Sequence, residues 1–207
     1  MLFALNCLPS TDSPGYLGWL VAQLGGWKHG ARLAQDQTWC KPPGAGPLVF
    51  HRDSAYFDFT PQDVITVWLA LDNMDPEVGP LEYAVGSHQW GEGRHGSASQ
   101  FFSPNRRELM DDAAQRNGVK PEDVVIRAAT VRAGGVGIHN GRTWHGSGSN
   151  ESTRVRRGVG MHFVPAEARL RTDIEIGALW RRCQKRTGSL ELPEEEMPTT
   201  YAPTLPL

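Results

Sequence analysis

The alternation of hydrophobic and polar positions along the chain predicts many short strands and few helices. Residues 64–71 (VITVWLAL) form a nearly continuous run of β-branched, aliphatic and aromatic residues, which is typical of a strand buried on both faces. Weaker alternation predicts the remaining strands. We expect these at residues 32–40, 48–56, 81–85, 124–131, 137–145 and 154–164.

Three segments carry helical patterns. Residues 13–26 are amphipathic and end in two glycines, and residues 105–117 follow a serine–proline pair suited to a helix start. Residues 172–186 have acidic residues early and basic residues late, as the helix dipole favours. The tail from residue 190 contains four prolines and three consecutive glutamates, so we expect an extended or loosely ordered arm.

The layout predicts a mainly β fold. Glycine and proline together make up 38 of the 207 residues (23 glycines, 15 prolines) and are spread along the chain, as in proteins with many turns. Two blocks of strands flank a helical insertion near residues 91–118. We therefore expect a double-stranded β-helix, a cupin-like jelly roll with flanking helices, as a single domain over residues 1–189 with a proline-rich arm over 190–207.

Composition excludes several classes of protein. A formal net charge of −2 gives no indication of a nucleic-acid partner. No stretch approaches the roughly 20 apolar residues that a membrane span requires. Three scattered cysteines do not form a disulfide framework, so we expect an intracellular, cytoplasmic setting. Composition does not indicate the oligomeric state.

The first candidate for chemistry is the motif His51-Arg52-Asp53. Side chains two apart on a strand point to the same face, so a strand here would place His51 and Asp53 side by side with Arg52 facing away. One histidine and one carboxylate are two of the three ligands in the facial triad that binds Fe(II). Alone, this short motif is weak, and the third ligand must come from another strand.

His145 and Arg156 strengthen the case. The prediction places His145 at the end of a strand, before a glycine-rich turn, and Arg156 on the returning strand. The same face of that strand carries Arg154, Gly158, Gly160 and His162, whereas the other face is mostly apolar. An arginine among glycines indicates room for a ligand, and a guanidinium binds a carboxylate well.

The order of motifs resembles the phytanoyl-CoA dioxygenase family of Fe(II)/2-oxoglutarate-dependent oxygenases. The likeness runs from about residue 35 to 164 and rests on several pieces in register. These are Lys41-Pro42-Pro43, the His51/Asp53 motif, Tyr56-Phe57, Trp68, residues 79–83 (GPLEY), Gly86-Ser87-His88 and the turn from His145 to Arg156. Family members usually have more residues before the first motif, so we expect a shortened N-terminal part.

The resemblance implies a role for each matched residue. His51, Asp53 and His145 would bind the iron, and Arg156, helped by Ser147, would bind the distal carboxylate of 2-oxoglutarate. Two looser matches, Gln37 and Trp68, would line the cosubstrate pocket, although either could be purely structural. The implied reaction is hydroxylation of an unidentified small organic or acyl substrate by O2, releasing succinate and CO2.

Two other functions stay open at this stage. A zinc hydrolase could use the same ligands, although a carboxylate clamp would have no evident purpose there. A cupin-like metal-binding protein that has lost turnover would fit the shortened N-terminal part. Outside the site, we expect Lys41 to be a solvated turn residue and His139 to brace the strand of His145.

Overall fold

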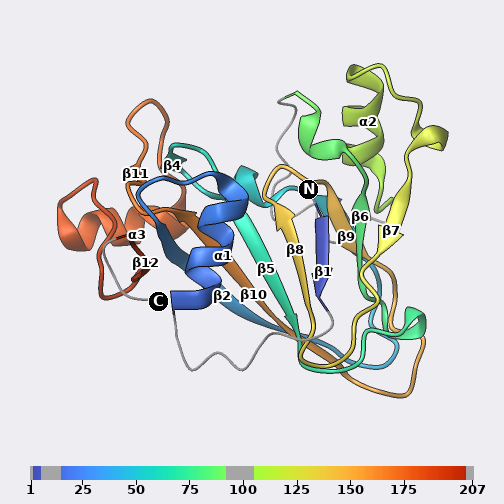
Figure 1. The fold of residues 1–207 in the computed structure, drawn as a ribbon. Helices are drawn as coiled ribbons and strands as arrows, with labels where there is room; N and C mark the ends of the chain where they lie inside the picture. Colours follow the sequence, from blue (N-terminus) through green and yellow to red (C-terminus); the bar gives the residue numbers. More distant parts are fainter. Residues whose placement is uncertain (1, 6–14, 92–104, 204–207) are drawn as a thin grey trace.

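The computed structural model describes residues 2–5, 15–91 and 105–203, and two antiparallel β-sheets form its centre (Figure 1). The larger sheet has the strand order β1 (Leu2–Leu5), β8 (Val136–Asn140), β5 (Ile65–Ala70), β10 (Arg156–Pro165), β2 (Ala31–Lys41) and β12 (Thr199–Tyr201). The smaller sheet has the order β3 (Leu48–His51), β9 (His145–Ser147), β6 (Leu81–Ala84) and β7 (Ile126–Ala128). This arrangement confirms the predicted mainly β jelly-roll core.

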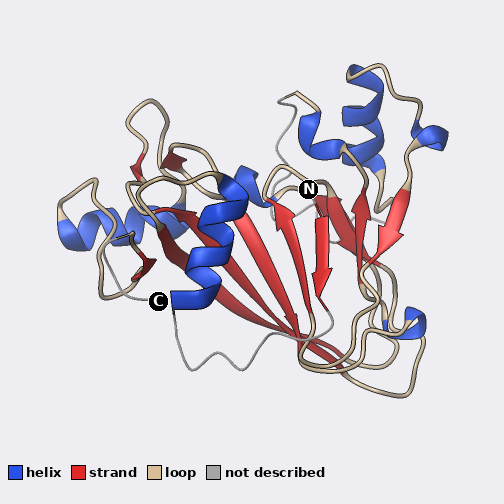
Figure 2. Cartoon of the chain, viewed as in Figure 1, coloured by secondary structure: helices blue, strands red, loops and turns tan. Residues whose placement is uncertain are grey.

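Strand alternation decides which side chains enter the space between the sheets. On β5, Ile65 and Val67 face outward and pack with Val21 and Ala22 of helix α1 (Gly15–Gly25), which covers the larger sheet. Trp68 faces inward and meets side chains of the smaller sheet. Helices lie at the periphery and strands in the centre (Figure 2).

Two further apolar clusters close the molecule. The outer face of the smaller sheet packs on helix α2 (Glu108–Arg116) through Phe50, Trp144 and Met110. Helix α3 (Ala178–Thr187) and the two-stranded ribbon of β4 (Phe59–Thr60) and β11 (Arg169–Leu170) share another cluster, in which Trp180 is buried. Among the described residues, no helix has the length and apolar character needed to cross a membrane.

Two predicted strands that carry site residues are interrupted. The strand expected at 48–56 ends at His51, and Asp53–Tyr56 form a 3-10 helix, because the backbone N–H of Ser54 donates to Gly141 O (2.9 Å) and draws the chain across the barrel. The strand expected at 137–145 is two strands in different sheets. Asn140 ends the first one and accepts a backbone hydrogen bond from Thr143 (2.8 Å), which forms the turn.

Other expected boundaries also shift. The strand expected at 124–131 is shorter and spans Ile126–Ala128. The helix expected at 172–186 begins at Ala178, so its acidic residues precede the helix instead of occupying its first turn. The tail residues Leu192 and Met197 are buried, and Thr199–Tyr201 pair with β2, so the described part of the arm packs against the core.

Gly158 permits the close packing of Trp68 against β10. A Cβ at Gly158 would lie 2.6 Å from Cζ2 of the Trp68 indole, whereas one at Gly160 would meet nothing nearer than 3.6 Å. We expect Gly158→Ala to lower the free energy of unfolding by about 1–3 kcal/mol through overpacking. Gly160→Ala is the matched control and should cost less in the same urea denaturation series. Equal losses would contradict this packing argument.

Candidate metal centre

His51 and His145 are brought together by strand pairing in the smaller sheet. They are directly opposite each other across β3 and β9, and their ring centroids are 4.2 Å apart. Each Nδ1 lies 3.0 Å from a backbone carbonyl, that of Val49 for His51 and that of Thr143 for His145. Because a carbonyl can only accept, each Nδ1 carries the proton and each Nε2 carries a lone pair.

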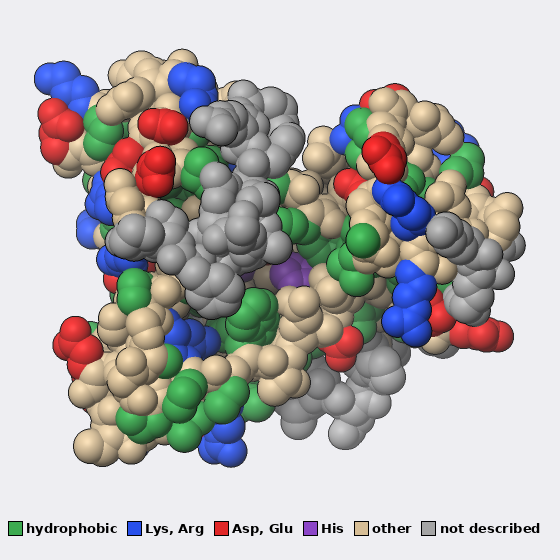
Figure 3. Space-filling view, turned by 180° about the vertical axis from the view of Figure 1, so that it is seen from behind, with side chains coloured by type: hydrophobic (Ala, Val, Ile, Leu, Met, Phe, Trp, Pro, Cys, Tyr) green, Lys and Arg blue, Asp and Glu red, His purple; other side chains and the backbone are tan. Residues whose placement is uncertain are grey.

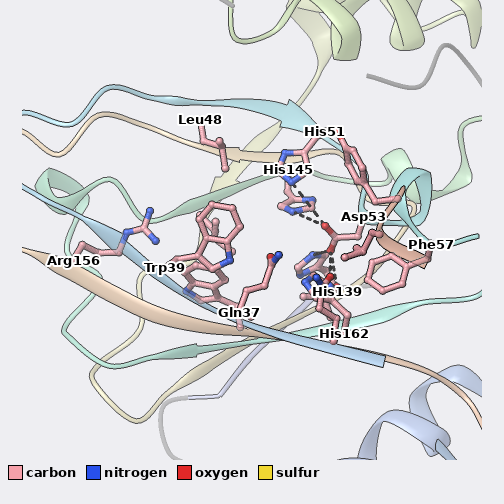
Figure 4. Close-up of a pocket in the computed structure, with 17 residues that line it drawn as sticks. Gln37, Trp39, Leu48, His51, Asp53, Phe57, His139, His145, Arg156 and His162 are labelled. Carbon is pink, nitrogen blue, oxygen red and sulfur yellow. Dashed lines mark hydrogen bonds and ion pairs between the residues drawn. The ribbon is translucent and has the colours of Figure 1, made fainter. Parts of the chain in front are cut away.

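Asp53 lies between the two sheets. Its Oδ1 faces both imidazoles, 3.8 Å from His51 Nε2 and 3.5 Å from His145 Nε2. Its Oδ2 accepts hydrogen bonds from the Thr66 hydroxyl (2.6 Å) and from His139 Nε2 (3.0 Å), both on the larger sheet. The carboxylate is therefore oriented by one sheet and presented to the histidines of the other (Figure 4).

Burial and neighbouring groups set the charge of this cluster. Burial lowers the pKa of His51 and of His145 to about 4, so both are neutral at pH 7. Burial alone would raise the pKa of Asp53, but the imidazoles of His145 and His162 and the hydrogen bond from His139 hold this pKa well below its usual range. The cluster therefore presents two neutral imidazoles and one carboxylate.

Three electron-pair donors that face one another suit a cation. The candidate ligand atoms of His51, Asp53 and His145 all lie within 4.8 Å of one another. Donors about 2.1 Å from a shared ion lie roughly 3.0–3.5 Å apart, so these residues fit a metal after a small inward adjustment. Two histidines and one carboxylate are the donor set of the facial triad that binds Fe(II).

Thr66 and His139 orient Asp53, and removing one of them tests their effect on the metal. Thr66→Val deletes the hydroxyl that donates to Asp53 Oδ2 while keeping the volume of the side chain. We expect metal affinity to fall by about 10–100-fold, the usual effect of losing a partner of a ligand. Competition with a chelator measures this, and Thr66→Ser should retain the affinity. Wild-type affinity in Thr66→Val would contradict the orienting role.

Arg156 lies at the opposite end of the same cavity from the metal cluster (Figure 4). Its side chain is buried, and its guanidinium carbon lies 5.3 Å from the centroid of the Trp68 ring. Among the described residues no carboxylate is within ion-pair distance of Arg156, and its buried Nε has no hydrogen-bond partner. Burial lowers the pKa of Arg156 to about 10, so it remains charged at pH 7.

Lys41 is not the solvated turn residue that we expected. It ends β2 opposite Arg156 and is 8% exposed. Its ammonium donates to Ser147 Oγ (2.9 Å) and to the Gly148 carbonyl. The prediction failed because the turn begins only after Lys41, so strand pairing with β10 directs this side chain inward.

The cavity has a volume of about 230 Å³, and Figure 3 shows a histidine side chain at the floor of a hollow in the surface. Of the residues singled out from sequence, Gln37, Trp68 and Arg156 line it together with the three candidate ligands. Ser147 is fully buried and lies outside the set of described residues that line the cavity. Arg154, expected on the inner face, precedes β10 and pairs with Asp75 at the surface (2.7 Å).

Several residues of the site were not predicted from the sequence. His162 lies 3.7 Å from Asp53 Oδ2 through its Nδ1, and it had been placed on the same face as Arg156 without a role. Trp39 and Phe57 are further aromatic residues of the cavity wall. Strand alternation could have found Trp39, because it shares a face of β2 with Gln37.

Comparison with known proteins identifies a family and several relatives. The family model for phytanoyl-CoA dioxygenase (PhyH) matches residues 18–158. A probable alpha-ketoglutarate-dependent hypophosphite dioxygenase of Stutzerimonas stutzeri is 30% identical over 139 residues, covering 66% of this chain and 46% of the relative. The dioxygenase cdmA of Talaromyces verruculosus is 27% identical over 161 residues, covering 70% and 46% respectively.

Solved structures share the fold. The non-haem alpha-ketoglutarate-dependent carbocyclase SnoK from nogalamycin biosynthesis superposes with a TM-score of 0.62 at 24% identity, covering 80% of this chain and 62% of SnoK. The epimerase SnoN from the same biosynthesis has a TM-score of 0.59 at 22% identity, covering 75% and 57%.

The fold and the site define the class of this protein: it is a jelly-roll protein with a pair of histidines and a carboxylate between two sheets. Because the family model matches well over half of its residues, the chain belongs to the phytanoyl-CoA dioxygenase family. The chain spans about half the length of the curated relatives that it matches (46% of each).

Proposed function

We propose that the protein is an Fe(II)/2-oxoglutarate-dependent dioxygenase that hydroxylates a small organic or acyl substrate. The carrying observation is one cavity with three converging metal-ligand atoms at one end and a buried arginine at the other. Membership of the family and the names of the curated relatives support the same reaction class. The free cysteines Cys40 and Cys183 agree with an intracellular setting, which we also propose.

The proposed ligand set follows from the donor atoms. Nε2 of His51, Nε2 of His145 and Oδ1 of Asp53 would hold the metal. Iron bound there together with 2-oxoglutarate would supply oxygen activation: one oxygen atom of O2 would enter the succinate formed from 2-oxoglutarate with release of CO2, and the other would enter a substrate C–H bond. The protein contributes binding, orientation and exclusion of water.

Arg156 would bind the distal carboxylate of 2-oxoglutarate. A buried guanidinium without an anionic partner is costly, and a bound carboxylate would supply that partner through paired hydrogen bonds. Trp39, Trp68 and Leu48 line the cavity along with Arg156 and would flank the aliphatic middle of the cosubstrate. This cationic end favours the oxygenase over a zinc hydrolase, which has no need of it.

The wall nearest Asp53 favours an organic substrate. Phe57 packs against His162 with ring centroids 5.1 Å apart, and Tyr56 meets the ring of His51 edge-on at 6.3 Å. Leu179 of α3 also lines the cavity and is more than half exposed. Apolar and aromatic walls bind apolar surface, so we propose a substrate with an aromatic or aliphatic body.

The test is oxygen-dependent turnover of 2-oxoglutarate. Protein loaded with Fe(II) should form succinate from 2-oxoglutarate in air, and the zinc-loaded protein should form none. Hypophosphite, named for the Stutzerimonas stutzeri relative, is the comparison compound for a panel of small aromatic and aliphatic acids and alcohols. We expect organic compounds to stimulate succinate formation more than hypophosphite does. Absence of succinate under every condition would favour a binding protein without turnover.

A further inference from the structure

A second buried cation stands beside Arg156. Lys41 and Arg156 are opposite each other across the antiparallel pair β2–β10, which places their side chains on the same face and close together. Both are nearly fully buried, and among the described residues no carboxylate lies within ion-pair distance of either cation. Two neighbouring buried cations without a carboxylate partner are unfavourable unless an anion binds beside them.

The hydrogen bonds of Lys41 determine what Ser147 can do. An ammonium only donates, so Ser147 Oγ accepts from Lys41 and its own hydrogen remains available to donate elsewhere. Ser147 follows His145 by two residues on β9, and alternation therefore gives their side chains the same face. Ser147 is fully buried behind the cavity wall, so its hydroxyl would donate to a carboxylate bound at Arg156 once the side chains that cover it move aside.

We propose that Lys41 is a positioning residue of the 2-oxoglutarate site, which fixes the Ser147 hydroxyl as a donor and adds its charge to that of Arg156 at the distal carboxylate. This inference rests on the proposed function. It makes the Arg156 end of the cavity a site in which the lining guanidinium is backed by Lys41 and the Ser147 hydroxyl behind the wall, selective for a cosubstrate that carries a second carboxylate.

Neighbouring groups do not neutralise the charge of Lys41. The other charged groups that face Lys41 are Arg156 on β10, Glu82 on β6 and Arg106 ahead of α2. Glu82 pairs with Arg106, so its carboxylate is already compensated. Burial, followed by the repulsion from Arg156, lowers the pKa of Lys41 to about 8. A bound carboxylate would favour the protonated form of Lys41. A ligand with a carboxylate should therefore bind more tightly below about pH 8.

The experiment compares two ligands in anaerobic titrations of the Fe(II)-loaded protein. 2-Oxoglutarate carries the distal carboxylate, and 2-oxopentanoate has the same chain length without it. In Lys41→Met we expect the Kd for 2-oxoglutarate to rise by about tenfold or more, because one charged hydrogen-bonding group is lost. The Kd for 2-oxopentanoate should change by less than about threefold. Arg157→Met is the matched control, because it also replaces a cation by methionine. Arg157 follows Arg156 on β10, but it is exposed and pairs with Asp72.

Two outcomes would overturn the proposal. Unchanged 2-oxoglutarate binding in Lys41→Met would show that the lysine is dispensable. Equal weakening for both ligands would show a merely structural role. If the wild-type protein binds neither ligand, the proposed function fails instead, so the two failures are distinguishable.

Two further measurements separate the charge of Lys41 from its positioning of Ser147. If Lys41 acts through Ser147, adding Ser147→Ala to Lys41→Met should weaken binding by less than Ser147→Ala does alone. Full additivity would overturn the positioning. The wild-type Kd for 2-oxoglutarate should also rise as the pH passes above about 8, where free Lys41 loses its proton. An identical rise in Lys41→Met would overturn the assignment of that charge.

Discussion

Replacing Asp53 by alanine is expected to abolish iron binding and, with it, all formation of succinate. The side chain supplies the one negative charge among the three candidate ligands, and its two oxygens divide between the metal side and the supporting residues Thr66 and His139. Loss of a single supporting residue already costs about 10–100-fold in metal affinity. Loss of the ligand itself should lower the metal affinity further, by more than about 100-fold in total, in a chelator competition assay.

The matched control for Asp53→Ala is Asp36→Ala. Asp36 is an exposed carboxylate on β2, so its removal changes the net charge by the same amount away from the site. Asp36→Ala should bind iron as the wild type does. Thermal unfolding of the metal-free proteins checks that Asp53→Ala is folded. Normal iron binding and turnover in Asp53→Ala would show that the ligand assignment is wrong.

Arg156→Ala has the second largest expected effect, and it should separate cosubstrate binding from metal binding. Truncating one partner of a buried charge pair costs about 2–5 kcal/mol, which corresponds to roughly a 30-fold or greater rise in Kd for 2-oxoglutarate. Iron affinity should be unchanged, because the guanidinium lies at the far end of the cavity (Figure 4). Titration of the iron-loaded variant with 2-oxoglutarate measures the Kd for 2-oxoglutarate, and competition with a chelator measures the affinity for iron.

Arg154→Ala is the control for this variant. Arg154 is two residues earlier, exposed, and paired with Asp75 and Glu77 at the surface, so its loss should leave 2-oxoglutarate binding unchanged. A variant that loses iron together with 2-oxoglutarate would indicate collapse of the cavity. Tight 2-oxoglutarate binding in Arg156→Ala would contradict the proposed carboxylate site.

The sequence predicted the candidate ligands for a partly wrong reason. Alternation on a single strand was expected to align His51 with Asp53, but the strand ends at His51 and Asp53 begins a 3-10 helix. The two side chains still meet, because the backbone bond from Ser54 to Gly141 carries the carboxylate across to the larger sheet. That bond joins residues 87 positions apart, and no local pattern contains it.

His145 shows what short-range patterns miss in the second half of the chain. We expected one strand to continue through Asn140 and to end at His145. In the structure a turn follows Asn140, and His145 begins the separate strand β9. An asparagine followed by glycine is a turn signal and was available in the sequence. The pairing of His145 with His51 across two strands depends on tertiary register, which the sequence alone does not specify.

Residues that support the site were the hardest to predict. Lys41 and Thr66 gain their roles from neighbours more than ten positions away, Ser147 for the lysine and Asp53 for the threonine. The strand of Arg156 was predicted well because its glycines and its apolar face alternate with the period of a strand. Periodicity therefore identified which face bears the site, whereas the partners of each polar group required the fold.

The most direct test of the central claim is an anaerobic titration of the wild-type protein with Fe(II) and 2-oxoglutarate. We expect a metal-to-ligand charge-transfer band that saturates at one iron and one 2-oxoglutarate per chain. Such a band requires the metal and the cosubstrate to meet in one site, as the cavity between His51, Asp53, His145 and Arg156 allows. Absence of the band when both are in excess would contradict the account.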